Sequence, residues 1–485
     1  MLLKQPKLLY LLFFTELWER FGFYTIQTIL ILYVTHALGF SDNKAYIFTA
    51  AFNAFLYLTV VPGGMLADKM FGFQRSILIG GSILTLGYLS LAMPHEILFY
   101  AGLSLLILGQ GLFKPNISSI VGTLYAKDDP KRESGFTIFY LGINIGSLIP
   151  PLFLGPLTDK FGWNSGFLVA MFGLLISLIT FTIGRKYLKN RGEIPANSIL
   201  LRRPALRTRF NFYFVVGLIV TAIIFYIALQ APLYSNLLVI IISVAVIFYL
   251  LGITIPLPKV ERDGMLACII LIVISIGFWA IYNQTFSSLM LYADRNMAPD
   301  FLGMKIGAEF TQAFNPFFII TLAPLLSYLW PALGKYNPSY PMKFALSAFL
   351  IAIGMFVLAL GTQLFNHHGL TSPWWLVLSY AIQTAGELCI SPIGLSMITV
   401  LAPSRYVGTM MGVWFLATSA SFAVSGGLAT IANVPANTDI MTSQALYIHA
   451  FNVYGFLGLA LGVIGLLLVP KLKKMCAVTI NHAAT

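Results

Sequence analysis

The chain has 485 residues, of which 58% are hydrophobic and only 9% are charged, and its mean hydropathy is +0.85. A soluble protein carries about a quarter charged residues, so this composition excludes a soluble enzyme. Apolar runs long enough to cross a hydrocarbon core of roughly 30 Å follow one another from the amino terminus to Pro470. The sequence therefore predicts an all-α polytopic membrane protein.

Fourteen transmembrane helices are predicted. They cover residues 8–35, 44–67, 77–92, 98–125, 136–158, 166–188, 211–229, 233–254, 265–292, 309–330, 342–362, 373–400, 406–431 and 446–469. The first is too long for a signal peptide and no cleavage site follows it, so we expect nothing to be removed. We group the chain into an N-terminal six-helix bundle (1–190), a cytoplasmic linker with an inserted helix pair (191–260), and a C-terminal six-helix bundle with a short cytoplasmic tail (261–485).

The net charge of +12 is explained by membrane topology. Of the 29 Lys and Arg residues, 23 fall in connections on the side of the amino terminus and two, Arg20 and Lys114, lie inside spans. Only Lys44, Lys160, Arg295 and Lys305 lie on the other side. The positive-inside rule then places both termini in the cytoplasm, and no nucleic-acid partner is expected.

A sequence motif that occurs twice indicates nested repeats in the N-terminal half. Gly64-Met-Leu-Ala-Asp68-Lys69, followed by Gly72, recurs as Gly155-Pro-Leu-Thr-Asp159-Lys160, followed by Gly162. Three-span units repeated within a six-span half are how one large class of transporters is built.

Five charged side chains lie within predicted spans, where each costs about 2.5–3.5 kcal/mol at mid-bilayer. They are Glu16, Glu19, Arg20, Lys114 and Glu387. Structural ion pairing would need only two pairs and leaves one charge over, so we favour a functional role. Helical spacing also gives the first span one polar and aromatic face, which must look into the bundle. That face carries Glu16, Glu19, Arg20, Phe23, Tyr24 and Gln27.

The fourth span contains Gly109-Gln-Gly111-Leu-Phe-Lys114-Pro115-Asn116. Its glycines permit close approach of another helix, and Pro115 frees a backbone carbonyl. We expect a broken helix here, which is tolerated only where it lines protein or a watery cavity. A kink without any role in transport is the alternative, and the adjacent Lys114 disfavours it.

Polar residues, glycine and proline also interrupt the apolar pattern of other spans, where we expect further helix breaks. Glu387 lies in Gly386-Glu387-Leu-Cys-Ile-Ser391-Pro392, and a buried carboxylate can take up a proton near neutral pH unless a cation holds it ionised. Further breaks occur at Asn144, Gly146, Pro150 and Pro151, and at Gln312, Asn315 and Pro316. Tyr24, Tyr57, Trp279 and Trp414 suit a cavity wall, although packing is the simpler explanation for each alone. The six histidines form no ligand pair, so no metal and no cofactor is expected.

Several motifs in this order resemble those of the proton-dependent oligopeptide transporters of the major facilitator superfamily, in the bacterial fourteen-span branch. They are Glu16-x-x-Glu19-Arg20-Phe21, Gly63-Gly64-x-Leu-Ala-Asp68, Gly111-x-Phe113-Lys114-Pro115-Asn116, Phe136 to Tyr140 with Ile143-Asn144-x-Gly146, Phe278-Trp279, Asn315-Pro316 and Gly386-Glu387-x-x-x-Ser391-Pro392.

The resemblance implies two six-helix bundles around a central site, which imports di- or tripeptides or similar zwitterions with protons by alternating access. It implies a monomer in the bacterial inner membrane, and proton coupling through Glu16, Glu19, Arg20, Lys114 and Glu387. Arg20 and Lys114 would face the peptide carboxylate or pair with the Glu16 and Glu19 carboxylates. Asn144, Asn315 and Glu387 would receive the amino group, and the substrate set also includes Tyr24, Tyr57, Trp279, Ser391 and Trp414.

Three positions depart from the family pattern. Gln27 stands where an arginine is usual, Asn283 where an acidic residue is usual, and Ala50 where animal members have a histidine. The loss of one charge of each sign leaves the net charge of the cavity unchanged, which suggests that the two were partners. We therefore predict that Gln27 and Asn283 face each other as an amide pair.

Two other classes of function were weighed. A proton-translocating subunit of a respiratory complex also has about this number of spans with buried Lys and Glu, but the repeated Gly-x-Leu-x-Asp loop argues against it. A membrane-embedded transferase or protease would need a nucleophile arrangement, a metal cluster or a phosphate loop, and the sequence shows none of these motifs.

Overall fold

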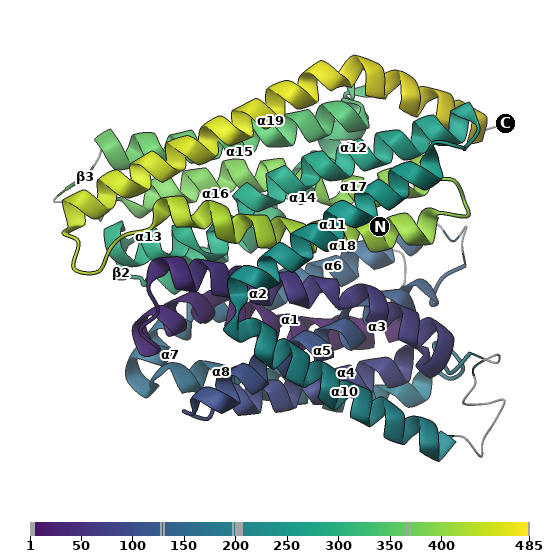
Figure 1. Ribbon diagram of the computed structural model, residues 1–485, viewed down its shortest axis with the longest axis horizontal. Coiled ribbons are helices and arrows are strands. Elements are labelled where there is room, and N and C mark those ends of the chain that lie inside the picture. Colours follow the sequence, from purple (N-terminus) through teal and green to yellow (C-terminus); the bar gives the residue numbers. More distant parts are fainter. Residues whose placement is uncertain are drawn as a thin grey trace. The chain divides into compact units, whose positions relative to one another are not determined.

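The computed structural model describes residues 5–126, 129, 131–195, 198, 207–364, 366–367 and 370–483. Over these residues the chain is almost entirely helical, with two short β-hairpins (Figure 1). Its contacts divide it into two compact units. Unit 1 comprises Met1–Tyr33 and Phe55–Ser235, and unit 2 comprises Val34–Ala54 and Asn236–Thr485.

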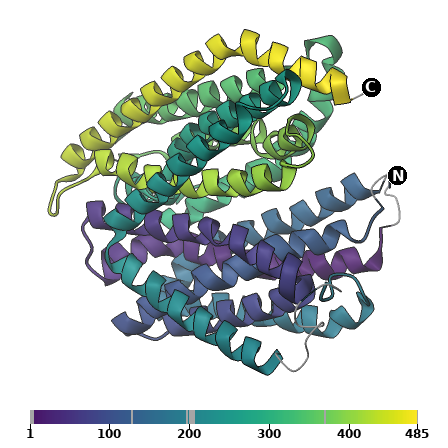
Figure 2. The ribbon, with the colours of Figure 1, turned by 45° about the vertical axis from the view of Figure 1, so that its right-hand side comes forward.

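Unit 1 contains the helices of the N-terminal half and the first inserted helix. They are α1 (Lys7–Leu32), the end of α2 (Asp42–Leu58), α3 (Val60–Leu66), α4 (Gly72–Leu91), α5 (Glu96–Gly122), α6 (Arg132–Leu148), α7 (Leu154–Phe161), α8 (Trp163–Gly184) and α10 (Arg207–Gln230). Short π or 3-10 turns extend them at Ala67–Phe71, Pro150–Leu152 and Arg185–Tyr187. α4 packs along α5, and α1 packs against both α6 and α8 (Figures 1 and 2).

Unit 2 contains the remaining helices and both hairpins. They are most of α2, then α11 (Pro232–Thr254), α12 (Lys259–Tyr282), α13 (Ser288–Asn296), α14 (Phe314–Ala332), α15 (Tyr340–Leu364), α16 (Pro373–Leu388), α17 (Ser391–Leu401), α18 (Val407–Ala429) and α19 (Ile440–Ala483). The antiparallel hairpins are β1 (Asp300–Phe301) with β2 (Met304–Lys305), and β3 (Asn366–His367) with β4 (Leu370–Thr371). α19, the long yellow helix in Figure 2, runs along α15.

The helix series confirms the predicted spans. Twelve stretches of the described residues are long and apolar enough to cross a membrane. One of them, Asp42–Leu91, has 50 residues and is divided at Gly72, whose φ of 72° ends one helix before the next begins. Because about 20 residues suffice for one crossing, this stretch accounts for two spans. The 26-residue α1 adds the fourteenth.

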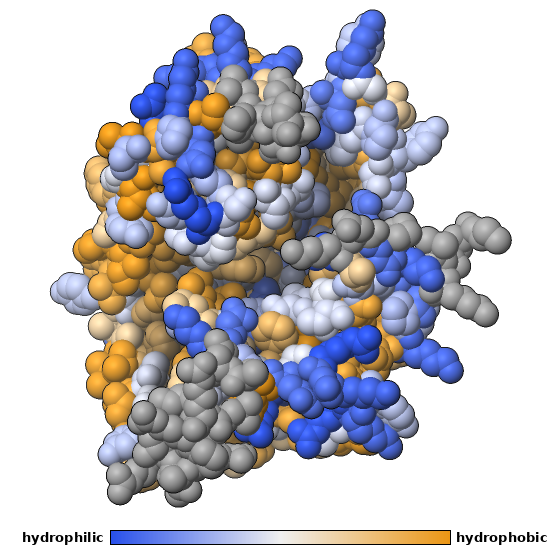
Figure 3. Space-filling view, turned by 90° about the vertical axis from the view of Figure 1, so that its right-hand side faces the viewer, coloured by the Kyte–Doolittle hydropathy of each residue, from blue (hydrophilic) through white to orange (hydrophobic). Residues whose placement is uncertain are grey.

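The exterior is apolar over long helices, as lipid contact requires. Large side chains on α10 and α11 are well exposed, for example Ile219 at 55% and Ile241 at 63%. Figure 3 shows hydrophilic side chains gathered on one face and apolar side chains along its flank. The last turns of α19 carry exposed Lys471, Lys473 and Lys474.

The internal repeat predicted from the sequence is also present in the backbone. Gly72 follows the first copy with φ 72° and ψ 164°, and Gly162 follows the second with φ 80° and ψ 164°. Only glycine adopts this conformation readily. The two copies therefore end in the same turn, which starts α4 in one case and α8 in the other.

Four spans were predicted to be interrupted. In the tenth, a 3-10 turn at Ala308–Ala313, which contains Gln312, precedes α14, so the regular helix begins only at Phe314. The fifth span breaks between α6 and α7 at Pro150-Pro151, and the twelfth breaks between α16 and α17 before Ser391. The prediction for the fourth span is wrong, because α5 continues through Pro115. The proline removes the hydrogen bond to the Gly111 carbonyl, and a Cβ on Gly63 of α3 would lie 1.9 Å from that oxygen. The freed carbonyl thus lies where α3 approaches most closely.

The carboxyl-terminal residues beyond the last predicted span are helical. α19 continues without interruption through Pro470 to Ala483. Its sequence beyond Pro470, Lys-Leu-Lys-Lys-Met-Cys-Ala, offers good helix formers and no glycine, so the helix has no reason to end there.

The division by contacts groups two segments differently from the domains proposed from the sequence, whose boundaries stay a prediction. Residues 34–54 join unit 2 although they belong to the first two helices, and the inserted pair is shared, with α10 packed on α5 of unit 1 and most of α11 in unit 2. The Asn236 amide of α11 donates to the Ile47 carbonyl at 2.9 Å, which ties both segments into unit 2. Residues 199–206 of the predicted linker lie outside the described residues.

Candidate functional site

Three charges of α1 form a buried cluster in unit 1. Arg20 donates from Nε to Glu19 Oε2 at 2.6 Å and from Nη2 to Glu19 Oε1 at 2.7 Å. The carboxylate of Glu16 lies farther away, with Oε1 at 3.4 Å from Arg20 Nε. All three residues are at most 2% exposed. The cluster is held against α6 because Gly146 lies against the Leu17 carbonyl and the Arg20 Cβ, where a Cβ would clash.

The two carboxylates are not equivalent. Glu19 uses both oxygens in short bonds to Arg20, whereas Glu16 Oε2 is buried without a hydrogen-bond partner among the described residues. A buried carboxylate oxygen that lacks a donor is costly in its charged form. Glu16 is therefore the less well stabilised anion of the pair.

Lys114 lies on the neighbouring helix α5 and forms no ion pair with any described carboxylate. Its ammonium instead lies over two aromatic rings, at 4.8 Å from the centroid of Tyr57 and 5.6 Å from that of Phe23. The guanidinium of Arg20 covers the Phe23 ring as well, at 4.5 Å. Lys114 is therefore held over aromatic rings, and its charge also acts on the Glu16 carboxylate of α1. Which of the two predicted partners it binds stays a prediction.

Unit 2 holds a second cluster, centred on Glu387. Its Oε2 accepts from the Tyr282 hydroxyl at 2.8 Å and from the Asn315 amide at 2.8 Å. The same amide donates to Thr384 Oγ1 at 3.0 Å. Glu387 is 8% exposed and has no ion pair within the described part of the chain. The break between α16 and α17 begins directly after this carboxylate.

Three other predicted site residues contact their own helices. Tyr24 packs edge-on to Phe23, and Trp279 packs edge-on to Tyr282. The Asn144 amide donates to the Tyr140 carbonyl of its own helix, at 2.9 Å.

Two more predicted residues are found at α17 in unit 2. Ser391 belongs to that helix, and Trp414 of α18 packs against it. Trp414 rests on the bare Cα of Gly394, where any larger residue would overlap the indole, so it has a packing role. Ser391 is the first residue of α17 and is partly exposed.

The two variant amides belong to different units. Gln27 is 4% exposed in unit 1, and Asn283 is 4% exposed in unit 2, where its amide donates to Ser421 Oγ at 3.2 Å. Their pairing remains a prediction.

Sequence reasoning missed three polar neighbours of the charged residues. They are Gln110, Tyr282 and Thr384. Helical spacing could have found each of them, because Gln110 precedes Lys114 by one turn, Tyr282 follows Trp279 by three residues and Thr384 precedes Glu387 by three. No group of described residues could hold a metal ion.

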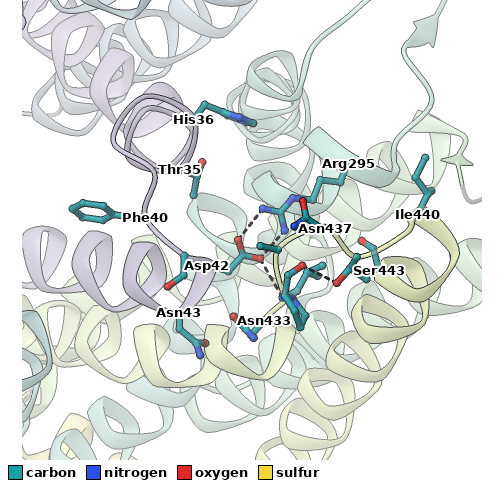
Figure 4. A pocket seen from close by; sticks show the side chains of 15 residues that line it. Thr35, His36, Phe40, Asp42, Asn43, Arg295, Asn433, Asn437, Ile440 and Ser443 are labelled. Atoms are coloured by element: carbon teal, nitrogen blue, oxygen red, sulfur yellow. Dashed lines mark hydrogen bonds and ion pairs between the residues drawn. The ribbon is translucent and has the colours of Figure 1, made fainter.

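A polar pocket of about 570 Å³ lies in unit 2, between residues 34–43 and the start of α19 (Figure 4). Arg295 of α13 reaches Asp42 with two hydrogen bonds, of 2.6 and 2.8 Å, and the backbone amide of Val434 donates to the same carboxylate. Asp42 is 4% exposed, so this pair is well shielded from water. It anchors residues 34–54 to unit 2.

His36 reinforces the same attachment at the edge of the pocket. Its Nε2 lies 2.9 Å from Asp294 Oδ2, just beyond the predicted end of the first span. The hydrogen bond to Asp294 raises the pKa of His36 above its ordinary value, while partial burial opposes the shift. No sequence pattern predicts this contact, because 258 residues separate the two side chains.

Comparisons with known proteins identify the family of the chain. The sequence pattern of the POT family matches residues 74–448. Over 483 residues the chain is 36% identical to dipeptide and tripeptide permease A of Yersinia pestis, covering 99% of this chain and 95% of that protein. A variant of peptide transporter POT in complex with alafosfalin is 34% identical with a TM-score of 0.85, covering 97% and 96% of the two chains. A POT family transporter in complex with 5-aminolevulinic acid is 28% identical with a TM-score of 0.84, covering 96% and 97%.

The similarity extends over nearly the full length of both the sequences and the structures. It includes the helix series, so the predicted major facilitator fold is confirmed, and the matched proteins are transporters and not enzymes. The chain is a multi-pass membrane protein and belongs to the POT family of transporters.

Proposed function

We propose that the protein is a proton-coupled symporter that imports di- or tripeptides, or similar small zwitterionic solutes, by alternating access. Relatives named as dipeptide and tripeptide permeases support this substrate class. The complex with 5-aminolevulinic acid supports it too, because that molecule carries an amino group and a carboxyl group. The respiratory-subunit alternative is not favoured, since the matched relatives are permeases over almost their whole length.

The observation that carries the proposal is that each unit contains, among its described residues, a charge within a span that forms no ion pair, and that the two charges have opposite signs. Unit 1 contributes Lys114, a cation without a carboxylate partner among the described residues, and unit 2 contributes Glu387, a carboxylate without a cation. A short peptide is a zwitterion whose two ends are separated by about 3.3–3.6 Å per residue. The two units thus carry charges of opposite sign within their spans, as do the two ends of such a substrate, and these end charges are common to peptides with any side chain.

We assign proton coupling to the same buried groups. Protonation of a glutamate in the α1 cluster weakens its hold on Arg20, which together with Lys114 then attracts the substrate carboxylate. Glu387 and Asn315 receive the amino group, and Asn144 supports that role from unit 1. Tyr24, Tyr57, Trp279, Ser391 and Trp414 complete the proposed substrate set.

Peptides with one blocked end test the charge assignment. In vesicles that contain the purified protein, we expect a free dipeptide to compete for pH-driven uptake at least about tenfold better than its C-terminal amide or its N-acetyl form, since each blocked end loses a charged partner. In Lys114→Ala, the penalty for amidation should disappear while the penalty for acetylation remains. In Glu387→Gln, the pattern should be reversed.

Matched controls are available for both variants. Lys343 is another buried lysine that lies over an aromatic ring, Trp330, at 4.6 Å, and Glu309 is another buried glutamate. Lys343→Ala and Glu309→Gln should retain both penalties. Equal competition by free and blocked peptides in the wild type would contradict the proposed substrate class.

We further propose that the protein acts as a monomer in the inner membrane with both termini in the cytoplasm. The distribution of Lys and Arg supports this orientation. A cysteine introduced at Lys473 should be protected from a membrane-impermeant maleimide in intact cells, whereas one introduced at Thr438 should be labelled. The three native cysteines are buried and give little background. The opposite labelling pattern would reverse the orientation.

A further inference from the structure

Gln110 touches both members of the α1 ion pair from the neighbouring helix. It lies on α5, one turn before Lys114, and is 2% exposed. With its amide oxygen toward the guanidinium, it accepts from Arg20 Nη2 at 2.8 Å, and its amide nitrogen donates to Glu19 Oε1 at 3.0 Å. The reverse orientation would place the amide nitrogen against the guanidinium and the amide oxygen against the carboxylate. The charges therefore fix the orientation of the side chain.

The backbone on both sides of Gln110 is held in place by close helix contacts. A Cβ on Gly109 would lie 2.8 Å from the Gly80 carbonyl oxygen of α4, and one on Gly111 would lie 2.6 Å from the Thr59 carbonyl oxygen. Thr59 also donates from its hydroxyl to the Ile107 carbonyl of α5 at 2.9 Å. Because α5 is fixed at these contacts, the amide of Gln110 is presented to the ion pair in a set position.

The contact with Gln110 makes the surroundings of the two glutamates, Glu16 and Glu19, different. Glu19 Oε1 receives donors from both Arg20 and Gln110, and Oε2 receives a third from Arg20. Protonating Glu19 would weaken three charge-assisted hydrogen bonds and leave Gln110 wrongly oriented. Protonating Glu16 would weaken one contact of 3.4 Å with Arg20 and the attraction of Lys114 from α5, but its Oε2 has no hydrogen-bond donor to lose among the described residues.

We propose that Gln110 is a positioning residue that keeps Glu19 ionised and paired with Arg20, and thereby makes Glu16 the carboxylate that takes up the transported proton. This inference rests on the proposed function, because it assumes that the α1 cluster couples proton entry to transport. Gln110 acts through Glu19 and Arg20 and contacts neither the proton nor the peptide.

A suppressor experiment in proteoliposomes tests the assignment. Glu16→Gln should lower pH-driven peptide accumulation at least about tenfold, because Glu19 stays ionised, while counterflow exchange without a pH gradient stays within about twofold of the wild type. Adding Gln110→Leu should remove one donor from Glu19 and raise its proton occupancy about tenfold. The double variant Glu16→Gln with Gln110→Leu should then recover part of the accumulation. The double variant Glu19→Gln with Gln110→Leu should not recover accumulation, because Glu16 is then the one carboxylate of the cluster left to pair with Arg20.

Two further double variants separate a positioning role from a structural one. Gln110→Asn keeps a shorter carboxamide and should rescue Glu16→Gln less well than Gln110→Leu does. Gln383→Leu makes the same change at another buried amide, in unit 2, and should give no rescue. Melting temperatures in detergent identify any variant that fails to fold.

The outcomes distinguish this inference from the proposed function. Full accumulation by Glu16→Gln, or no rescue by a folded Gln110→Leu, would overturn the role of Gln110 while the proposed symport stands. A wild-type protein that accumulates peptide without any response to the pH gradient would overturn the symport itself.

Discussion

At the scale of single residues, the buried carboxylates of the two units have different surroundings, so replacing them should have different effects on transport and binding. Glu19 is held by a cation, whereas the hydrogen-bond donors to Glu387 among the described residues are neutral, Tyr282 and Asn315. We expect Glu19→Gln and Glu387→Gln each to abolish proton-driven accumulation, because each removes a carboxylate whose charge alternates or compensates during the cycle. Glu19→Gln should retain peptide binding, and Glu387→Gln should also weaken it.

Uptake under an imposed pH gradient measures the first effect, and competition binding in detergent measures the second. Asn315 provides a graded control, because Asn315→Ala removes one donor to Glu387 and keeps the carboxylate. It should weaken binding less than Glu387→Gln does. Normal uphill uptake by either glutamine variant would remove its assigned role.

The charged residues of the site were easier to predict than their neutral partners. A charge within a span is expensive, so Glu16, Glu19, Arg20, Lys114 and Glu387 stand out against an apolar background. Gln110 and Tyr282 are cheaper to bury and give no comparable signal. The orientation of a neutral side chain depends on which helices pack together, and hydropathy along one helix does not contain that information.

At the scale of elements, the close approach of α3 and α5 depends on particular glycines. A Cβ at Gly63 would lie 1.9 Å from the backbone oxygen of Gly111, and backbone atoms cannot move aside as a flexible side chain can. We expect Gly63→Ala to destabilise the protein by about 1–3 kcal/mol, as overpacking of a tight interface does. Gly64→Ala is a matched control, since its Cβ would make an ordinary 3.6 Å contact with Pro115. Melting in detergent should separate the two, and equal melting temperatures would argue against rigid packing here.

The helices themselves were predictable because a span must be apolar over about 20 residues. The places where helices end were harder to predict. Pro150-Pro151 interrupts a span, whereas α5 continues through Pro115 and α14 through Pro324, so a proline alone does not predict where a helix ends. The two-residue strands of both hairpins are too short to give a periodic pattern.

The attachment of residues 34–54 to unit 2 should depend on pH through His36. Its pKa is raised by Asp294, so the protonated form favours the contact. The stabilisation is complete below the ordinary value of about 6.5 and is lost as the pH rises through the raised value. Hydrogen exchange of residues 34–41, corrected for intrinsic rates, should therefore be faster at about pH 8 than at about pH 5.5.

His36→Gln retains a hydrogen-bonding side chain but does not titrate, so it should remove this pH dependence. The Asp42–Arg295 pair provides a reference, because its two hydrogen bonds hold the same segment without His36, and Arg295→Gln should leave the pH dependence in place. Equal protection of residues 34–41 at the two pH values in the wild type would show that His36 does not control the attachment.

At the scale of the whole molecule, alternating access requires the two units to move against each other. The chain passes between the units after Tyr33, after Ala54 and after Ser235. The first passage coincides with the π-helical turn Tyr33–Ala37, and the second falls within the continuous helix α2. Movement of the units must therefore either bend α2 near Ala54 or break the bonds that hold residues 34–54, including the Asp42–Arg295 pair.

The paired departures at Gln27 and Asn283 make a prediction about coupling between the units. Each residue is 4% exposed, so a lone charge at either position would be poorly hydrated. Gln27→Arg alone and Asn283→Glu alone should each lower uptake about tenfold or more, because breaking or omitting one partner of a buried ion pair is strongly destabilising. Together the two changes restore a pair, and the double variant should transport better than either single one.

The usual arginine and acid would also respond to proton entry, whereas an amide pair cannot change its charge. Closure in the natural protein should therefore depend less on pH than in the double variant, and its selectivity for a free peptide carboxylate should be weaker. Counterflow exchange at several pH values measures the first property, and competition by amidated peptides measures the second. Asn283 already donates to Ser421 within unit 2, so Ser421→Ala is needed to separate the loss of that bond from a loss of pairing. Strictly additive damage in the Gln27 and Asn283 double-mutant cycle would show that the two residues do not interact.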